Sequence, residues 1–114
     1  MPSDTLHRPP DIDPDTLRND IIAVLKQIYD PEIPINIYDL GLIYEIRAST
    51  YGQVYIKMTL TTPACPVAQS FPSVVENHVR MVPGVYDVVV ELVWDPPWSK
   101  ERMTRDGALQ FEFL

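Results

Sequence analysis

The first regular pattern of apolar residues along the chain predicts a helix. Asp13 offers a capping oxygen and Pro14 lacks the N–H that a first helical turn leaves unpaired, so this pair is a helix-start signal. Beyond it, apolar residues recur at helical spacing on one face, at Leu17, Ile21, Val24, Leu25 and Ile28. Asp30 followed by Pro31 predicts the end of this helix, because proline removes a backbone donor and restricts the residue before it.

Three stretches predict strands, because apolar and polar residues alternate in them or β-branched residues are frequent. Residues 42–48 and 54–60 form the first two, and the residues between them, 49–53, predict a hairpin turn. Residues 85–93 are the most β-branched stretch of the chain and predict the third strand.

A second helical pattern lies between the second and third predicted strands. Its face consists of Val67, Phe71, Val74, Val75, His78 and Val82. Pro72 leaves two alternatives for its start: the regular helix begins near Ser70, with Pro72 in the first turn, or it begins at Pro66 and kinks. Pro83 and Gly84 predict its end.

The element order is therefore α-β-β-α-β, which predicts an α/β (α+β) fold with a mixed three-stranded sheet packed by helices. We expect residues 1–12 to be a flexible N-terminal arm and residues 13–114 to form one domain. The proline-rich but apolar segment 30–41 is expected to pack against that domain. Near the end, Ser99 predicts a short capped helix, and residues 111–114 a last strand or a docked tail.

Composition narrows the classes of function. A formal net charge of −7, from 9 basic and 16 acidic residues, makes nucleic acid and anionic membranes poor partners. No apolar run approaches the ~20 residues that span a bilayer, and the first residues do not resemble a signal peptide. The single cysteine excludes an internal disulfide and fits a reducing compartment. A soluble, cytoplasmic protein is expected.

Cys65 is the first candidate for chemistry. It lies between Pro63 and Pro66, after a predicted strand and before a predicted helix. A helix N-terminus beside the thiol lowers the pKa of a cysteine and favours the thiolate, and Thr61 and Thr62 would add hydroxyl donors. Composition alone favours the alternative, a buried cysteine that fills apolar space. The position in a loop at a helix start reverses that preference.

Three carboxylates in the predicted loop, those of Asp30, Glu32 and Asp39, are the second candidate. Paired carboxylates can bind a cation or act as acid and base. Spacing alone favours a simpler interpretation, in which Asp30 ends a helix, Asp39 forms a turn and Glu32 is solvated.

The two histidines and two tryptophans favour structural roles. His7 lies in the arm, and His78 falls on the apolar face of the second predicted helix, which is typical of a core histidine. Neither stands at metal-ligand spacing to Cys65, so no structural zinc site is expected. Trp94 and Trp98 could form a partner surface or cap one end of the core. Capping is the commoner role, and their burial is expected to be largely structural.

Three segments together resemble the iron–sulfur cluster assembly factor family, which includes SufT and the metal–sulfur cluster biosynthetic proteins. Residues 30–44 read DPEIPINIYDLGLIY, residues 58–66 read MTLTTPACP, and VPGV at 82–85 is followed by VELVWDPPWS at 90–99. The resemblance spans residues 17–104. The chain lacks the ATPase domain of some relatives and the cysteine-rich segment of the branch that serves the phenylacetyl-CoA oxygenase, so the short bacterial SufT type is the expected match.

The resemblance implies a small α/β domain with a role in maturing iron–sulfur proteins. It also implies one site around the reactive Cys65, lined by Thr61, Thr62, Asp30, Glu32 and Asp39. One cysteine cannot hold a four-thiolate cluster, so a cluster would be bound only transiently, with Cys65 as one ligand, and no tightly bound cofactor is expected. The expected partners are iron–sulfur scaffold proteins and apo client proteins, and shared ligation is compatible with a homodimer.

Three mechanisms stay open at this point. The protein could carry a cluster transiently, act as an adaptor that brings client and scaffold together, or work as a thiol-dependent enzyme with Cys65 as nucleophile and Glu32 or Asp39 as base. A carboxylate is a poor activator of a thiol, because its negative charge raises the pKa of the thiol. A non-enzymatic assembly or transfer factor is therefore the main prediction.

Overall fold

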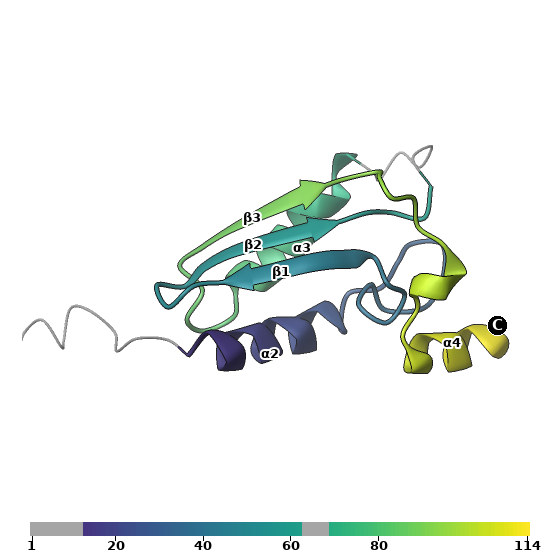
Figure 1. Ribbon diagram of the computed structural model, residues 1–114, viewed down its shortest axis with the longest axis horizontal. Helices are drawn as coiled ribbons and strands as arrows, with labels where there is room; N and C mark the ends of the chain where they lie inside the picture. Colours follow the sequence, from purple (N-terminus) through teal and green to yellow (C-terminus); the bar gives the residue numbers. More distant parts are fainter. Residues whose placement is uncertain (1–12, 63–68) are drawn as a thin grey trace, which may run out of the picture.

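The computed structural model describes residues 13–62 and 69–114 (Figure 1). Their elements in chain order are helix α2 (Pro14–Leu25), strands β1 (Ile43–Ala48) and β2 (Gln53–Met58), helix α3 (Phe71–Arg80), strand β3 (Asp87–Leu92), the short 3₁₀ helix η2 (Lys100–Arg102) and helix α4 (Arg105–Glu112). No helix in these ranges is long and apolar enough to cross a bilayer.

The three strands form one mixed sheet in the order β1-β2-β3. β1 and β2 pair antiparallel as a hairpin, and β3 pairs parallel to β2 after the crossover through α3. The predicted order α-β-β-α-β and the mixed sheet are confirmed. α2 packs on β1, α3 packs on β3, and the two helices contact each other, so both cover the same face of the sheet.

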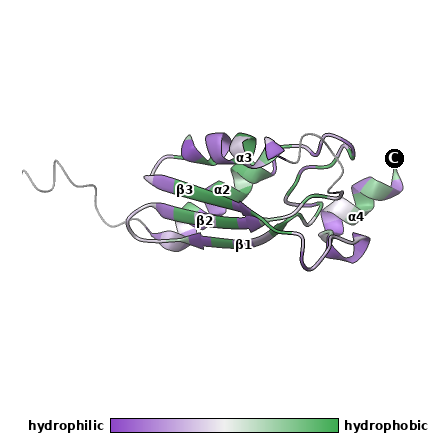
Figure 2. Ribbon diagram, turned by 90° about the horizontal axis from the view of Figure 1, so that it is seen from above, coloured by the Kyte–Doolittle hydropathy of each residue, from purple (hydrophilic) through white to green (hydrophobic). Residues whose placement is uncertain are grey.

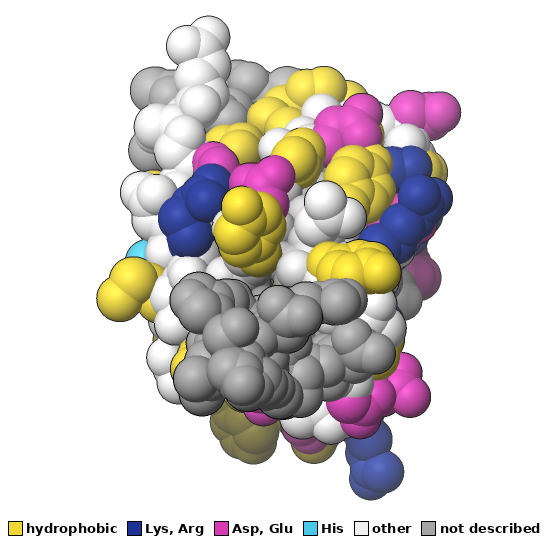
Figure 3. Space-filling model, turned by 90° about the vertical axis from the view of Figure 1, so that its left-hand side faces the viewer, with side chains coloured by type: hydrophobic (Ala, Val, Ile, Leu, Met, Phe, Trp, Pro, Cys, Tyr) yellow, Lys and Arg dark blue, Asp and Glu magenta, His cyan; other side chains and the backbone are white. Residues whose placement is uncertain are grey.

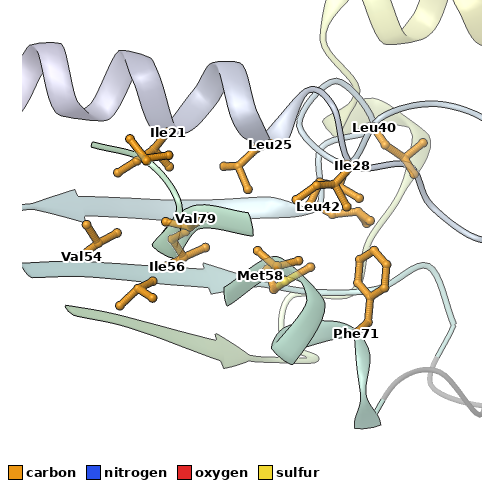
Figure 4. Close-up of a cluster of buried hydrophobic side chains, with 14 of the residues drawn as sticks. Ile21, Leu25, Ile28, Leu40, Leu42, Val54, Ile56, Met58, Phe71 and Val79 are labelled. Carbon is orange, nitrogen blue, oxygen red and sulfur yellow. The ribbon is translucent and has the colours of Figure 1, made fainter. Parts of the chain in front are cut away.

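The core lies between that face and the two helices. Every second residue of β2 points into it, and each of these, Val54, Ile56 and Met58, is buried. Figure 4 shows Ile21 and Leu25 from α2 and Val79 from α3 in this cluster. Val75 of α3 belongs to the same cluster and is fully buried. Each fully buried aliphatic side chain stabilises the fold by about 1.5–3 kcal/mol, which fixes the helices on the sheet.

α2 begins where the sequence predicts. The Asp13 carboxylate accepts hydrogen bonds from the Asp15 N–H and the Thr16 hydroxyl, and the Thr16 hydrogen bond lowers the pKa of Asp13. The helix is shorter than predicted and ends at Leu25. Beyond it the Ile28 N–H bonds only three residues back, to the Leu25 carbonyl, which tightens the chain while keeping Ile28 in the core.

α3 follows the first of the two alternatives for its start. It begins at Phe71 with Ser70 before it, so Pro72 lies in the first turn, where its missing N–H costs nothing. The prediction for His78 is wrong. Phe71, Val75 and Val79 form the buried stripe, which leaves His78 exposed, with its Nδ1 2.8 Å from the Val74 carbonyl oxygen.

The C-terminal segment differs most from its prediction. Residues 111–114 are neither a strand nor a fully docked tail. Phe111 belongs to α4 and packs against the core, whereas Phe113 is 87 % exposed. The short helix near Ser99 is present as η2, but the Ser99 side chain does not cap it. Instead Thr104 caps α4 by accepting a hydrogen bond from the Gly107 N–H.

Candidate functional site

Each of the three segments that carry the resemblance has a part at the same end of the sheet, whereas residues 82–85 of the third segment lie at the opposite end. Ile43 pairs with Met58, and Met58 pairs with Leu92, so the first residue of β1 lies beside the last residues of β2 and β3. The stretches beyond them, 30–42, 59–62 and 93–98, therefore lie together at this end, on the right in Figure 1. We call these three stretches the loop end of the sheet.

Hydrogen bonds tie the stretches of the loop end to the sheet and to one another. The Thr59 N–H donates to the Leu42 carbonyl at 2.9 Å, continuing the hairpin beyond β2. The Trp98 indole N–H donates to the Leu40 carbonyl at 2.7 Å. The Tyr44 hydroxyl donates to the carbonyl of Pro96 at 2.8 Å, just after the cis peptide bond that precedes this proline. The loop end is therefore a single packed unit.

Segment 30–41 packs against the domain, as predicted. Ile35, Ile37 and Leu40 have no exposed surface. The Ile37 N–H bonds to the Ile28 carbonyl at 2.8 Å, which draws the loop back onto the end of α2. A loop buried this deeply must pair its own polar groups, since water cannot reach them.

Asp30 is one of the residues that pair the buried polar groups of this loop. It is 6 % exposed, and its Oδ2 accepts hydrogen bonds from the N–H groups of Glu32 and Ile33, both at 2.8 Å. These bonds fix the turn at Pro31, so the Asp30 carboxylate organises the loop.

Asp39 stabilises a second turn of this segment and also binds Thr104 in the C-terminal segment. Its Oδ2 accepts from the Asn36 side-chain amide at 2.8 Å, and its N–H donates to the Asn36 side-chain oxygen at 2.8 Å. Its Oδ1 accepts from the Thr104 hydroxyl at 2.8 Å, while its carbonyl accepts from the Thr104 N–H at 2.9 Å. Both carboxylate oxygens are thus occupied, and they attach the C-terminal segment to the loop.

Glu32 differs from both aspartates. It is exposed, and its carboxylate forms no hydrogen bond or ion pair within residues 13–62 and 69–114. Thr61 and Thr62 follow β2 and are half-buried. Cys65 lies outside the described residues, so the gathering of Thr61, Thr62 and the three acidic residues around its thiol stays a prediction. The same holds for Cys65 as a cluster or metal ligand.

The two tryptophans do not share one role. Trp98 is half-buried against the core, as predicted. The prediction of structural burial is wrong for Trp94, which is 41 % exposed. The proline pair between them turns the chain so that only Trp98 reaches the core and the Leu40 carbonyl.

Thr104 and Asn36 are functional parts of this end that the sequence reasoning did not select. The signal for Thr104 is present in the chain, because a threonine directly before Arg105 and Asp106 is a helix N-cap pattern. No local signal indicates that Thr104 binds Asp39, which is distant in the sequence.

The loop end holds no preformed metal centre in the part of the chain that the structure describes. No group of three or more His, Cys, Asp or Glu residues there stands close enough together to bind a metal ion. Both carboxylate oxygens of Asp39 and one oxygen of Asp30 accept hydrogen bonds, whereas the exposed carboxylate of Glu32 accepts none within the described residues.

Comparison with known proteins agrees with the predicted resemblance. Residues 18–92 match the family model described as "Iron-sulfur cluster assembly protein". The chain is 43% identical over 95 residues to an Fe-S protein maturation auxiliary factor of Porphyromonas gingivalis, covering 83% of this chain and 90% of that protein. It is 36% identical over 78 residues to the Fe-S protein maturation auxiliary factor SufT of Staphylococcus aureus, covering 68% and 89%.

A solved structure confirms the fold. The crystal structure of a domain of unknown function from Bacillus anthracis superposes with a TM-score of 0.81 at 35% identity, covering 89% of this chain and 96% of that one. The family motifs, their meeting at one end of the sheet and these matches agree, and the chain belongs to the iron–sulfur cluster assembly protein family.

Proposed function

We propose that this protein is an accessory factor in the assembly of iron–sulfur clusters or the maturation of iron–sulfur proteins, and that it acts through Cys65 as a transient cluster carrier or client adaptor. The observation that supports this proposal is the meeting of the three family segments at the loop end of the sheet. The connection that contains Cys65 directly follows Thr62, which belongs to that end.

The hydrogen bonds of the loop end favour transient ligation. A cluster needs about four ligands, and this chain has one cysteine. Asp39 would have to break buried hydrogen bonds to contribute either oxygen, which costs about 1–3 kcal/mol for each polar group left unpaired. Asp30 is buried, and one of its two oxygens already accepts the N–H groups of Glu32 and Ile33. The remaining ligands of a cluster would then come from a client, a small thiol or a second copy of the chain. A cluster shared in this way can leave quickly.

The internal hydrogen bonds of the loop end also support the adaptor form of the proposal. A loop end that is fixed internally presents Glu32 and the exposed face of Trp94 in constant positions. Exposed aromatic side chains are frequent anchors in protein interfaces, because they bury much area with few rotatable bonds. Scaffold proteins and apo client proteins are the partners that this form requires.

The thiol-enzyme alternative receives no support from the relatives, since both of those described above are named maturation factors.

Anaerobic reconstitution with iron and sulfide, followed by transfer to an apo-acceptor, tests the proposal. A carrier gains visible absorbance and activates the acceptor, and both are lost in Cys65→Ser. Thr62→Ser, which keeps a hydroxyl beside the cysteine, is the matched control and should behave as wild type. An adaptor stays colourless but co-purifies with scaffold or apo client. A protein that takes up no cluster and retains neither partner contradicts the proposal.

Replacement of Cys65 in cells separates function from folding. Serine is nearly isosteric, so Cys65→Ser should change the free energy of unfolding by no more than about 1 kcal/mol. It is neither a soft ligand nor a thiolate at neutral pH, so iron–sulfur enzymes such as aconitase should lose activity when demand for clusters is high. The abundance of the variant must be measured alongside. Full complementation by a stable Cys65→Ser protein would leave only an adaptor that does not use the thiol.

A further inference from the structure

A groove follows the outer side of β1, away from β2. Its volume is about 390 Å³, and its floor and walls come from β1, α2, the loop end and the η2 segment. Residues 43–46 of β1 form one side, and the other sides are formed by Arg18, Tyr38, Gly41, Glu101, Arg102 and Thr104. Glu32 and Trp94, from which we argued the adaptor form of the proposed function, do not line this groove.

The strand beside the groove has a free edge. β1 is the first strand in the sheet order and pairs only with β2. Figure 2 shows it at the outer edge of the sheet, with no other strand alongside. Within the described residues, the backbone hydrogen bonds of Ile43–Ala48 all go to β2 and its flanks. An edge strand with unpaired N–H and C=O groups can accept an extended segment as a further strand.

The walls of the groove carry arginines without ion-pair partners. Arg18 and Arg102 form no salt bridge with any residue of 13–62 and 69–114. The Arg102 guanidinium lies over the Tyr44 ring, 4.4 Å from its centroid, which holds its plane in place beside β1. A fixed guanidinium can bind a carboxylate through two parallel hydrogen bonds.

The acidic residues of the groove do not cancel these charges. Glu45 is already paired with Arg47 and Lys57 on the uncovered face of the sheet. Glu101 is the remaining acidic residue of the lining. The unpaired charges of the groove are therefore two guanidinium groups against one carboxylate, in a chain whose net charge is −7. This local excess of positive charge favours acidic side chains in the occupant.

The uncovered face of the sheet is different, because its charged groups are satisfied internally. Besides the Glu45 pairs, the Tyr55 hydroxyl donates to the Glu91 carboxylate, and this hydrogen bond raises the pKa of Tyr55 above its usual value. Arg47 also lies over the Tyr55 ring, at 5.3 Å.

We propose that the groove beside β1 binds an extended segment of a partner protein that carries acidic side chains, as a fourth strand next to β1 with its carboxylates on Arg18 and Arg102. The backbone of the segment pairs with the β1 edge, and the two arginines set its position. The proposed binding uses the β1 edge, Arg18 and Arg102 and not Cys65, so it does not depend on whether the protein carries a cluster.

Titration of the isotopically labelled full chain with a blocked peptide of alternating glutamate and valine tests the proposal by NMR. We expect saturable shifts of backbone amides within Ile43–Ala48 at low salt. The double variant R18Q/R102Q should bind about fivefold more weakly, as expected for two exposed ion pairs. The double variant R80Q/R105Q, an equal loss of charge outside the groove, should bind as wild type. Cys65→Ser should also bind as wild type, which separates this test from that of the proposed function.

Three further probes identify the occupant. The same peptide with alternate backbone nitrogens methylated cannot pair with an edge strand and should not bind. A lysine–valine peptide should not bind, and neither should glutarate at the same carboxylate concentration. Equal binding of the methylated peptide or of glutarate overturns strand addition, and the absence of saturable binding up to about 1 mM overturns the site. Concentration-dependent dimers that protect β1 without peptide would show that a second copy occupies the edge instead.

Discussion

The two ends of the sheet are held together in different ways. At the loop end, buried polar side chains connect three stretches that are far apart in the sequence, as Asp39 does with Thr104 and Trp98 with Leu40. The opposite end, the turn end, consists of the hairpin at 49–52 and the residues 81–86 that lead into β3. It is held mainly by backbone contacts. Buried side-chain hydrogen bonds are concentrated at the loop end, where residues 30–42, 59–62 and 93–98 of the family motifs lie.

The turn end depends on close approach of the main chain. Gly52 has a φ of +79°, and a Cβ on it would lie 2.2 Å from the Gly84 carbonyl oxygen. The Gly52 carbonyl also accepts a hydrogen bond from the Tyr86 N–H at 2.7 Å. Figure 3 faces this end and shows hydrophobic side chains interspersed with charged ones, with no single apolar patch. The exposed hydrophobic residues there include Tyr51, Met81 and Tyr86.

The length of the connections explains the difference. A tight hairpin satisfies its backbone groups within the turn, so it needs only a residue that tolerates a positive φ. The segment before β1 is long and buried, and its N–H and C=O groups need partners that no strand supplies. The side chains of Asp30 and Asn36 accept the N–H groups of Glu32, Ile33 and Asp39, and Asp39 in turn holds the Asn36 amide. The polar residues of the loop end are therefore a structural requirement of a buried loop.

The largest expected effect is at the turn end. Gly52→Ala should lower the free energy of unfolding by more than about 3 kcal/mol, because alanine is strained at positive φ and its Cβ would displace the Gly84 carbonyl. Urea denaturation followed by circular dichroism measures this loss. A loss below about 1 kcal/mol would show that the two turns move apart easily and that the turn end is not held by main-chain contact.

At the loop end, replacement of the two tryptophans should lower stability by clearly different amounts. Trp98→Ala should lower stability by about 3 kcal/mol, since it removes buried ring surface and leaves the Leu40 carbonyl without its donor. Trp94→Ala should lower it by less than about 1 kcal/mol, because this ring is 41 % exposed. Equal losses in the two variants, measured by urea denaturation, would contradict the assignment of Trp94 to the surface.

A smaller loss is expected from Asp39→Ala, about 2 kcal/mol, since it leaves the buried Asn36 amide and the Thr104 hydroxyl without their acceptor. Amide hydrogen exchange should increase in both the 36–41 turn and α4. Asp87→Ala, the loss of an exposed carboxylate at the turn end, should stay within about 0.5 kcal/mol and serves as the control. Exchange that increases in the turn without α4 would mean that Asp39 does not anchor the C-terminal segment.

The smallest effect on stability is expected for Glu32→Gln, within about 0.5 kcal/mol, because this side chain is exposed. If Glu32 lies near the thiol, removal of its negative charge should make Cys65 react about twofold faster with a neutral thiol reagent at neutral pH. Glu112→Gln, at the end of α4, should leave the rate unchanged. An unaltered rate in a folded Glu32→Gln protein would place Glu32 away from the cysteine.

Local patterns in the chain were sufficient to predict most of the fold. The pair Asp13 and Pro14 marks the start of α2 because capping depends on neighbouring residues only. The alternation in β2 and the β-branched run in β3 give strands within two or three residues of the observed ends. The C-terminal helix was missed, although Thr104 carries a capping signal.

The order of the two long helices and three strands, and the family, could be predicted from the chain alone, because hydrophobic spacing, caps and motifs are properties of adjacent residues. Which polar groups are free depends on the folded arrangement. The fold engages both carboxylate oxygens of Asp39 and one of Asp30, leaves Glu32 exposed and turns His78 to solvent. It also brings Arg18 and Arg102 to the free edge of β1. These outcomes depend on strand register and on contacts between distant segments, which no local pattern encodes.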